Sequence, residues 1–268
     1  LDDGSNSTVF PVRDGSRILF INNSLLWFNG AVGKYLPQLA QQSDPPFEIT
    51  VKQTGKGAGK VEEYVNWPTL KTREKINEGW DMVILQPWVE MTWKEPEKDF
   101  YPHVRTLVQW IRESGAVPLL YEPQMGWKTF PHSQPLVRER LDTIADELGV
   151  EVIHAGKVWE LMLARHAVER DQQGNLIKDK NNPGFVTMLY ADGVHQNAVG
   201  AMLNNYLIYK YLTGRSPVGL RPTQWEEKME AVIETVNQTF SSLPNGDVIS
   251  YMQEVADQHI ESHPAVTR

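Results

Sequence analysis

A serine near the start of the chain and an acid–histidine pair near its end are the residues best suited to chemistry. Ser24 follows an apolar run, in the block Asn-Asn-Ser-Leu at residues 22–25, and Asp192 lies three positions before His195 in the block Asp-Gly-Val-His. Nucleophilic acyl transfer needs these three groups: a hydroxyl, a base that takes its proton, and an acid that orients the base. Each block alone is a weak signal, because serine or aspartate beside a helix is commonly only a cap.

The bulk composition is ordinary for a soluble globular protein and is acidic overall. The chain has 268 residues, 41% of them hydrophobic and 22% charged, and its net charge is −8. This charge argues against nucleic acid and anionic membrane surfaces as main partners. The sequence holds no cysteine, so it has no disulfide, thiol nucleophile or cysteine-bound zinc. No apolar run approaches the roughly 20 residues of a membrane helix.

The amino-terminal residues favour export. The sequence begins at Leu1 without a methionine and continues through a polar stretch at residues 2–8. Such a start is expected of a mature protein whose leader has been removed, in the periplasm or outside the cell. A sequence cut from a longer one would look the same, so a cytoplasmic location stays open.

The elements that must position these residues alternate between strands and helices. Short apolar runs typical of strands occur at residues 18–21, 47–52, 82–86, 117–121 and 150–154. Helical spacing is found at residues 61–78, interrupted by Pro68, and at 103–113, 135–148, 196–212, 223–240 and 248–259. The polar stretch 170–184 is expected to be a loop.

This order predicts an α/β fold, a flavodoxin-like three-layer α/β/α sandwich with a five-stranded parallel sheet. We expect an amino-terminal tail at residues 1–16, the sandwich at 17–214, and a helical extension at 215–268 packed on it. Ser24, Gln86 and Glu122 each follow a predicted strand. Because sites on such sheets form at the carboxyl ends of the strands, we expect these residues to face one rim.

The ordered blocks resemble the SGNH, or GDSL-like, hydrolase superfamily across roughly residues 17–214. Asn-Asn-Ser-Leu stands where the family has its serine block, and Asp-Gly-Val-His matches its final block. The glycines of Gly-Lys-Gly-Ala-Gly at residues 55–59 stand where its second block supplies an amide. Leu-Gln-Pro at residues 85–87 stands in the third block and resembles a branch with Leu-Gln there. Two positions depart from the family: Asn22 replaces a glycine, and Gln86 replaces an asparagine.

The resemblance implies a serine esterase that needs no cofactor and no metal. Ser24 would be the nucleophile, His195 the base and Asp192 the orienting acid. The oxyanion would be held by the amides of Ser24 and of Gly57 or Gly59, together with the side chain of Gln86.

Several alternatives remain open at the level of single residues. Gln86 could instead be a buried amide that satisfies loop backbone, and Glu122 could be a site residue or a buried structural acid. Three tryptophans that follow strands could form a substrate platform or only pack the loops: Trp88, Trp93 and Trp127.

The first expectation for the substrate is an O-acetyl ester of a small carbohydrate or a polysaccharide. An O-acyltransferase with the same triad is an alternative within the enzymes. A non-catalytic carbohydrate-binding protein on a hydrolase fold is an alternative from another class. The sequence leaves the oligomeric state open.

Overall fold

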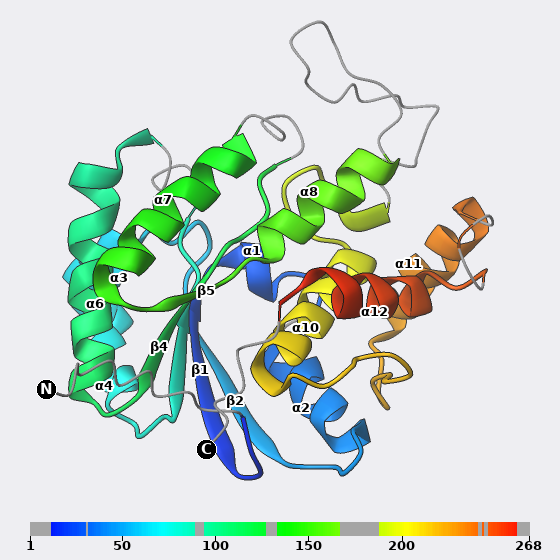
Figure 1. Cartoon of the computed structure of the whole chain (residues 1–268), viewed down its shortest axis with the longest axis horizontal. Helices are drawn as coiled ribbons and strands as arrows, with labels where there is room; N and C mark the ends of the chain where they lie inside the picture. The colour runs from blue at the N-terminus through cyan, green and yellow to red at the C-terminus, as the bar shows by residue number, and fades with distance from the viewer. Residues whose placement is uncertain are drawn as a thin grey trace, which may run out of the picture.

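The computed structural model describes residues 12–30, 32–88, 94–126, 133–166, 188–240, 243 and 246–261. Its centre is a sheet of five parallel strands in the order β2-β1-β3-β4-β5 (Figure 1). The strands are β1 (Ser16–Asn22), β2 (Ile49–Gly55), β3 (Met82–Leu85), β4 (Val117–Tyr121) and β5 (Glu151–Ile153). The predicted α/β fold with a five-stranded parallel sheet is therefore confirmed, with strand ends shifted by a few residues.

The strand sequences reflect their places in the sheet. All four residues of β3 are buried, as expected for a central strand that is covered on both faces. The edge strand β2 is mostly half-buried or exposed instead. Ile21 of β1 pairs with Leu85 of β3, and Asn22 pairs with Gly55 of β2. These three strands therefore end at the same level, so the segments that follow them begin side by side.

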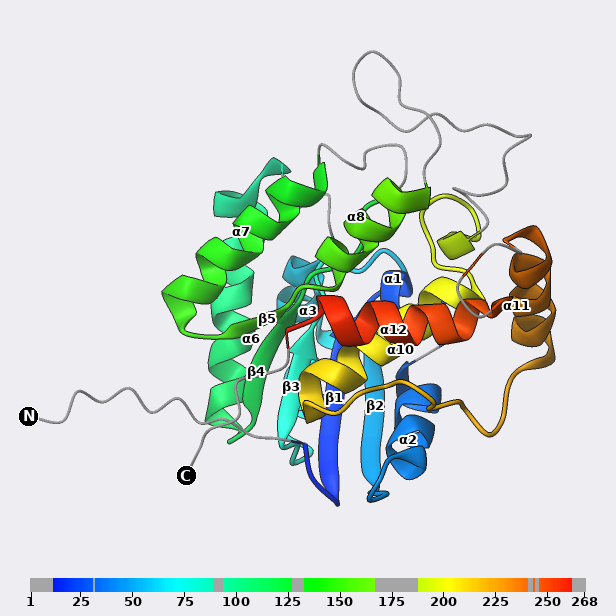
Figure 2. The same ribbon diagram turned by 45° about the vertical axis from the view of Figure 1, so that its right-hand side comes forward.

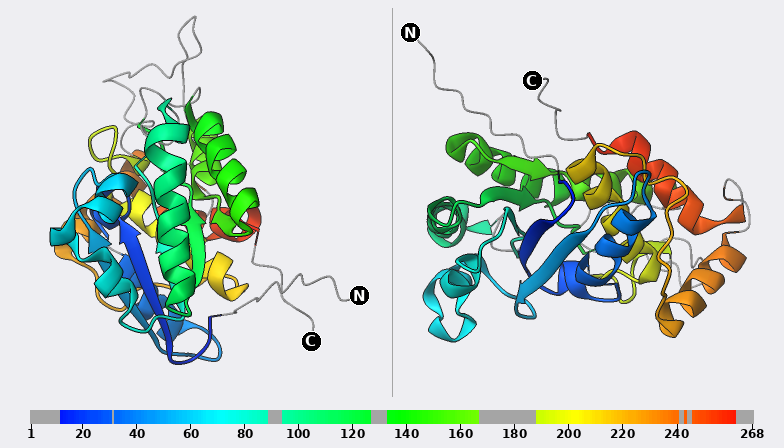
Figure 3. Two further views of the ribbon diagram at one scale, coloured as in Figure 1. Left: turned by 90° about the vertical axis from the view of Figure 1, so that its left-hand side faces the viewer. Right: turned by 90° about the horizontal axis from the view of Figure 1, so that it is seen from below.

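One face of the sheet is covered by helices from the middle of the chain. These are α3 (Val61–Asn66), α4 (Thr72–Ile76), α6 (Tyr101–Glu113) and α7 (Ser133–Leu148). The expected break at Pro68 is present, because a short 3₁₀ turn at Pro68–Leu70 separates α3 from α4. These helices lie together on one side of the strands (Figures 1 and 3).

The opposite face carries α2 (Val32–Gln42), α8 (Ala155–His166) and α10 (Ala198–Thr213). The sequence analysis did not assign α2 or α8, which connect strands of the sheet to the elements that follow. In α10, every residue except Lys210 and Thr213 is buried. A helix that is apolar all round must be covered on all sides, so α10 needs a second layer outside it.

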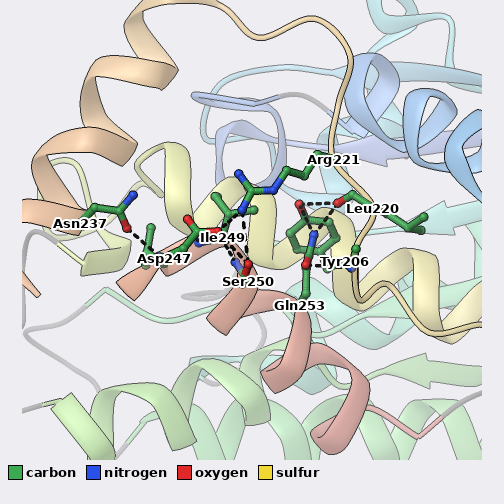
Figure 4. A network of polar contacts seen from close by, with 10 residues as sticks. Tyr206, Leu220, Arg221, Asn237, Asp247, Ile249, Ser250 and Gln253 are labelled. Carbon is green, nitrogen blue, oxygen red and sulfur yellow. Dashed lines mark hydrogen bonds and ion pairs between the residues drawn. The ribbon is translucent and has the colours of Figure 1, made fainter. Parts of the chain in front are cut away.

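The helical extension supplies that layer. Its helices α11 (Glu227–Thr239) and α12 (Val248–His259) lie beside α10, away from α6 (Figures 2 and 3). Residues 214–226 form a linker between α10 and α11. Gln253 of α12 is buried and joins this linker to α10 (Figure 4). It accepts a hydrogen bond from the Gly219 amide and donates to the Leu220 carbonyl and to Tyr206 Oη.

Figure 4 also shows how the start of α12 is fixed. Asp247 caps the helix by accepting hydrogen bonds from the amides of Ile249 and Ser250, and it pairs with Arg221 of the linker. Asn237 of α11 accepts a hydrogen bond from the Val248 amide at 2.7 Å. The two helices of the extension are thus tied to each other and to the linker. None of the described helices is both long and apolar enough to cross a membrane.

Candidate active site

Ser24 lies at the first turn after β1. Asn23 ends the extended segment with φ −121° and caps the short helix α1 (Ser24–Trp27) by accepting a hydrogen bond from the Leu25 amide at 3.0 Å. Neither Asn22 nor Asn23 has a positive φ. The turn therefore does not need the glycine that Asn22 replaces.

The acid and the histidine lie on a tight loop before α10. The loop is closed at its base by a bridge between Tyr190 and Gln196, and the Ala191 amide donates to the His195 carbonyl at 2.9 Å. Asp192 Oδ1 accepts hydrogen bonds from the amides of Val194 and His195 at 2.9 and 2.8 Å. Asp192 thus shapes the loop as well as contacting the imidazole.

The three predicted triad residues meet at this point, although Ser24 and His195 are 171 positions apart. His195 Nε2 lies 2.9 Å from Ser24 Oγ, and His195 Nδ1 lies 2.8 Å from Asp192 Oδ2. An ionised carboxylate can only accept, so Nδ1 carries the proton and Nε2 is left to accept from the hydroxyl. This is the arrangement in which a serine can be deprotonated by histidine.

The charge of Asp192 is favoured by its surroundings. Partial burial opposes ionisation, but hydrogen bonds from the His195 amide and imidazole and from the Val194 amide outweigh it, so the pKa of the carboxyl is lowered. The surroundings therefore favour the charged form of the acid, the form that an orienting group needs.

Two of the predicted oxyanion amides have no hydrogen-bond partner in the described part of the chain, those of Ser24 and Gly57. The third differs, because the Gly59 amide donates to the Lys56 carbonyl at 3.1 Å and closes the turn that carries Gly57. The Gly59 carbonyl in turn accepts from Asn23 Nδ2 at 3.3 Å. The loop of residues 55–59, called the glycine loop below, is thereby bonded to the residue before Ser24.

Gln86 is fully buried at the end of β3. Its Oε1 accepts a hydrogen bond from the Asn23 amide at 3.0 Å, and its Nε2 donates to the Pro87 carbonyl at 2.6 Å. Both ends of the side chain are thus bonded to loop backbone. This geometry corresponds to the structural alternative for Gln86, in which the amide fixes the turn before Ser24 instead of facing the reacting carbonyl.

The glycine loop is clamped by helix α3. Glu63 accepts hydrogen bonds from the Lys60 amide at 2.8 Å and from Lys56 Nζ at 2.7 Å, and so joins both ends of the loop. Tyr64 leaves no room for a side chain at Gly59, where a Cβ would lie 2.2 Å from its hydroxyl oxygen. Gly57 has open space around it. The sequence analysis did not single out Glu63, whose position three residues after Lys60 is the spacing of a capping box.

One aromatic ring contacts the triad, and a second lies beside Lys60. The Phe28 ring is 40% exposed, and its centroid lies 4.8 Å from that of His195. Trp88 is half-buried, with Lys60 Nζ 5.2 Å from its ring centroid. Trp93 and Trp127 lie outside the described residues. Of the three tryptophans that could form a substrate platform, the structure thus describes only Trp88.

Comparisons with known proteins show a likeness in fold. No family model matches the chain, and no curated protein matches its sequence. Among solved structures, a DUF4886 family protein from Bacteroides uniformis matches at 14% identity, 91% of this chain, 94% of that chain and TM-score 0.61. Axe2, an acetylxylan esterase from Geobacillus stearothermophilus, matches at 18% identity, 79% of this chain, 100% of that chain and TM-score 0.55. A candidate SGNH hydrolase from Slackia heliotrinireducens matches at 19% identity, 74% of this chain, 98% of that chain and TM-score 0.51.

The chain has the fold of these hydrolases. Identities below 20% carry no residue-level information, so the roles of Ser24, Asp192 and His195 depend on the geometry above.

Two buried glutamines that the sequence analysis did not identify fasten the histidine loop to α1. Gln196 Nε2 donates to the Phe28 carbonyl at 2.7 Å, and Gln124 Nε2 donates both to the Leu25 carbonyl and to Gln196 Oε1 at 3.2 Å. Asn29 Nδ2 adds a bond to the Gln196 carbonyl at 3.0 Å. A glutamine directly after the predicted catalytic histidine, at the start of an apolar helix, was the available signal.

Glu122 is a fully buried acid whose contacts explain its presence without a catalytic role. It accepts a hydrogen bond from Gln134 at 2.7 Å, lies 2.9 Å from His154 Nδ1 and forms an ion pair with Arg138 at 3.2 Å. These contacts fix the segment after β4, and none of them involves the triad. Of the two alternatives left open for Glu122, the geometry supports a structural acid.

The described surface has hollows, of which two bear on the site. One of about 420 Å³ lies among α7, β5 and α12, and includes none of the predicted site residues. The other, of about 350 Å³, lies between α11 and the base of the histidine loop, with Asn29 and Ala191 in its wall. In the described part of the chain, no group of three acidic or histidine side chains is placed to hold a metal ion.

Proposed function

We propose that the protein is a serine esterase that acts through Ser24, His195 and Asp192 and forms an acyl-enzyme. The observation that carries the proposal is the pair of contacts at 2.9 and 2.8 Å that link Ser24 to His195 and His195 to Asp192. Two consecutive hydrogen bonds of this kind activate a hydroxyl that is otherwise a weak nucleophile.

In the proposed reaction, Ser24 Oγ attacks the ester carbonyl while His195 Nε2 takes its proton. His195 then gives this proton to the leaving alcohol, and a water molecule repeats the sequence to release the acid. The amides of Ser24 and Gly57 would hold the charged oxygen, since neither has a partner in the described residues. Each such donor contributes roughly 2.7–4 kcal/mol to the transition state.

We further propose O-acetyl groups on a carbohydrate as the substrate. The exposed ring of Phe28 against His195 and the half-buried ring of Trp88 offer apolar surfaces of the kind on which sugar rings stack. The fold likeness to an acetylxylan esterase is in keeping with this choice. Transfer of the acyl group to a second sugar would use the same triad.

The test is to replace Ser24 by alanine and measure hydrolysis of an aryl acetate and labelling by a fluorophosphonate probe. We expect both to be lost, with a fall in kcat of several powers of ten, on the order of 10⁴ or more. Ser114→Ala is the matched control, because Ser114 ends α6 and its hydroxyl bonds only to the Ile111 carbonyl.

The alternatives give different results in the same experiment. A wild-type protein that binds carbohydrate but neither reacts with the probe nor hydrolyses the acetate would be a binding protein. A protein that takes the label and yields product only when an acceptor sugar is added would be a transferase.

A further inference from the structure

We infer that the hollow between α11 and the histidine loop is a subsite for an apolar group on the alcohol part of the ester. This inference rests on the proposed esterase function and gives the helical extension a role in choosing the substrate. It starts from the chemical nature of the lining. Buried Tyr190, Ala198, Met229 and Val236 line it, together with half-buried Val232.

The size of the hollow fits a small ligand group. Its volume is about 350 Å³, at the lower end of the range of about 300–1,000 Å³ for small-molecule sites. Lys228 and Thr235 are the exposed polar residues of α11 in its wall. Lys228 is already paired with Glu226 at 3.1 Å, so no unpaired charge from α11 is directed at a ligand. A phenyl ring or a short branched alkyl group is the kind of occupant that this lining suits.

The wall formed by α11 is held in place by α2. Tyr35 donates a hydrogen bond to Met229 Sδ at 3.0 Å and packs against the Trp225 ring at 5.8 Å between centroids. Lys34 adds an ion pair with Glu226 at 3.3 Å. Gly30 also comes so close to α10 and α11 that a Cβ would lie 3.1 Å from the Met229 methyl carbon. The α11 wall of the hollow is therefore held by packed elements.

The position of the hollow assigns it to the alcohol part. Asn29 in its wall directly follows Phe28, whose ring contacts His195, and Ala191 directly precedes Asp192. The hollow thus lies on the histidine side of Ser24, whereas the Gly57 loop lies on the other side, bonded through Gly59 to Asn23. In acyl transfer the histidine protonates the leaving oxygen, so the alcohol must extend towards the histidine side.

The experiment compares acetates that share one acyl group. Ethyl acetate and 2-phenylethyl acetate release alcohols of similar acidity and form the same acetyl-enzyme. We expect kcat/KM to be about tenfold or more higher for the phenylethyl ester, the gain usual for an apolar group that finds a fitting pocket. Val232→Phe, which fills the hollow, should reduce this ratio to about twofold or less.

The matched control is Ile233→Phe. Ile233 is the next residue of α11, also half-buried and aliphatic, but it does not line the hollow. It should keep the preference of the wild type. Deacetylation of the common intermediate should proceed at one rate in all three proteins, because the alcohol has left by then.

Contrary outcomes are distinct. Equal kcat/KM for the two acetates in the wild type would overturn the subsite and leave the esterase proposal intact. A gain for ethyl 3-phenylpropanoate that Val232→Phe removes would show that the hollow takes the acyl part instead. If no ester is cleaved, the NMR signal of the Met229 methyl group on titration with 2-phenylethanol still decides. A shift that Val232→Phe abolishes supports the subsite, and an unmoved signal overturns it.

Discussion

At the scale of single residues, each polar side chain of the site can bond to loop backbone, contact a reacting group, or do both. Asp192 does both, since one oxygen binds the amides of its own loop and the other faces the imidazole. Gln86 bonds only to loop backbone. Similar residue types at strand ends can therefore have different roles, and substitutions at these two positions should separate them.

Asp192→Asn should leave the loop intact and remove most of the activity. The amide oxygen can still accept from the Val194 and His195 amides, but the NH₂ group now faces Nδ1 and favours the tautomer with its proton on Nε2. We expect kcat for an aryl acetate to fall on the order of 10³–10⁴-fold, with KM little changed. A loss below about tenfold would show that Asp192 is only a loop residue.

The lowered pKa of Asp192 predicts how the stability difference between the wild type and Asp192→Asn depends on pH. The carboxylate stabilises the fold above the pH where an unfolded aspartate titrates, about 3.9, and this contribution is lost as the pH falls through the lower native pKa. The Tm difference between wild type and Asp192→Asn should therefore be larger at neutral pH than at strongly acidic pH.

Gln86→Ala should lower stability more than it lowers catalysis. The Asn23 amide would lose its acceptor in a buried place, which costs about 1–3 kcal/mol. Melting temperature and kcat measured on one preparation separate the roles. A fall in kcat of a hundredfold or more, about 2.7 kcal/mol, at an unchanged Tm would instead identify Gln86 as an oxyanion donor.

At the scale of elements, the catalytic geometry depends on the joint between α1 and the histidine loop. The two segments come from opposite ends of the chain, and Gln196 and Gln124 fasten one to the other by side-chain bonds to α1 carbonyls. The 2.9 Å contact between Ser24 and His195 is made across this joint. A loosened joint should therefore misplace the base while the binding surface stays as it was.

Gln196→Ala should reduce kcat on the order of tenfold to a hundredfold with little change in KM, because small misplacements of reacting groups carry large rate penalties. The rate of fluorophosphonate labelling should fall in parallel, since it needs the same activated hydroxyl. Gln109→Ala, an exposed glutamine on α6, is the control and should behave as the wild type. If Gln196→Ala only lowers Tm and labels at the normal rate, the glutamine does not position the triad.

At the scale of the whole molecule, α10 joins the sheet to the helical extension. It is buried on nearly all sides, with α12 covering the side away from the sheet. Removing water from so apolar a helix requires both neighbours, so the sandwich and the extension are expected to unfold together. The same extension carries α11, which forms one wall of the proposed subsite.

Gln253→Ala should therefore destabilise the whole protein. It leaves the Gly219 amide without its acceptor and removes the amide donor to Tyr206 Oη and to the Leu220 carbonyl, which keep only the bond between them, for a loss of about 1–3 kcal/mol. In urea, near-UV and far-UV signals should shift together to a lower midpoint with an unchanged slope. Gln238→Ala, exposed on α11, is the control. Two separate transitions would show that the extension folds independently.

The sequence by itself predicted the five strands and several of the helices, though not α2 or α8, and it marked Ser24, Asp192 and His195, which the structure brings together. Strands that are buried on both faces have nearly continuous apolar sequences. Ser24, Asp192 and His195 lie in short sequence blocks whose residue types suit acyl transfer and resemble those of a known family. Only the tertiary structure decided where Gln86 and Glu122 point, and that Gln124, Gln196 and Glu63 fasten the loops. Most of these partners lie many residues away in the chain, where no local pattern encodes a bond to them. Glu63 is the exception, because its bond to the Lys60 amide has the local spacing of a capping box. The hollow beside α11 belongs to the same class, since its walls come together only when the extension packs on α10.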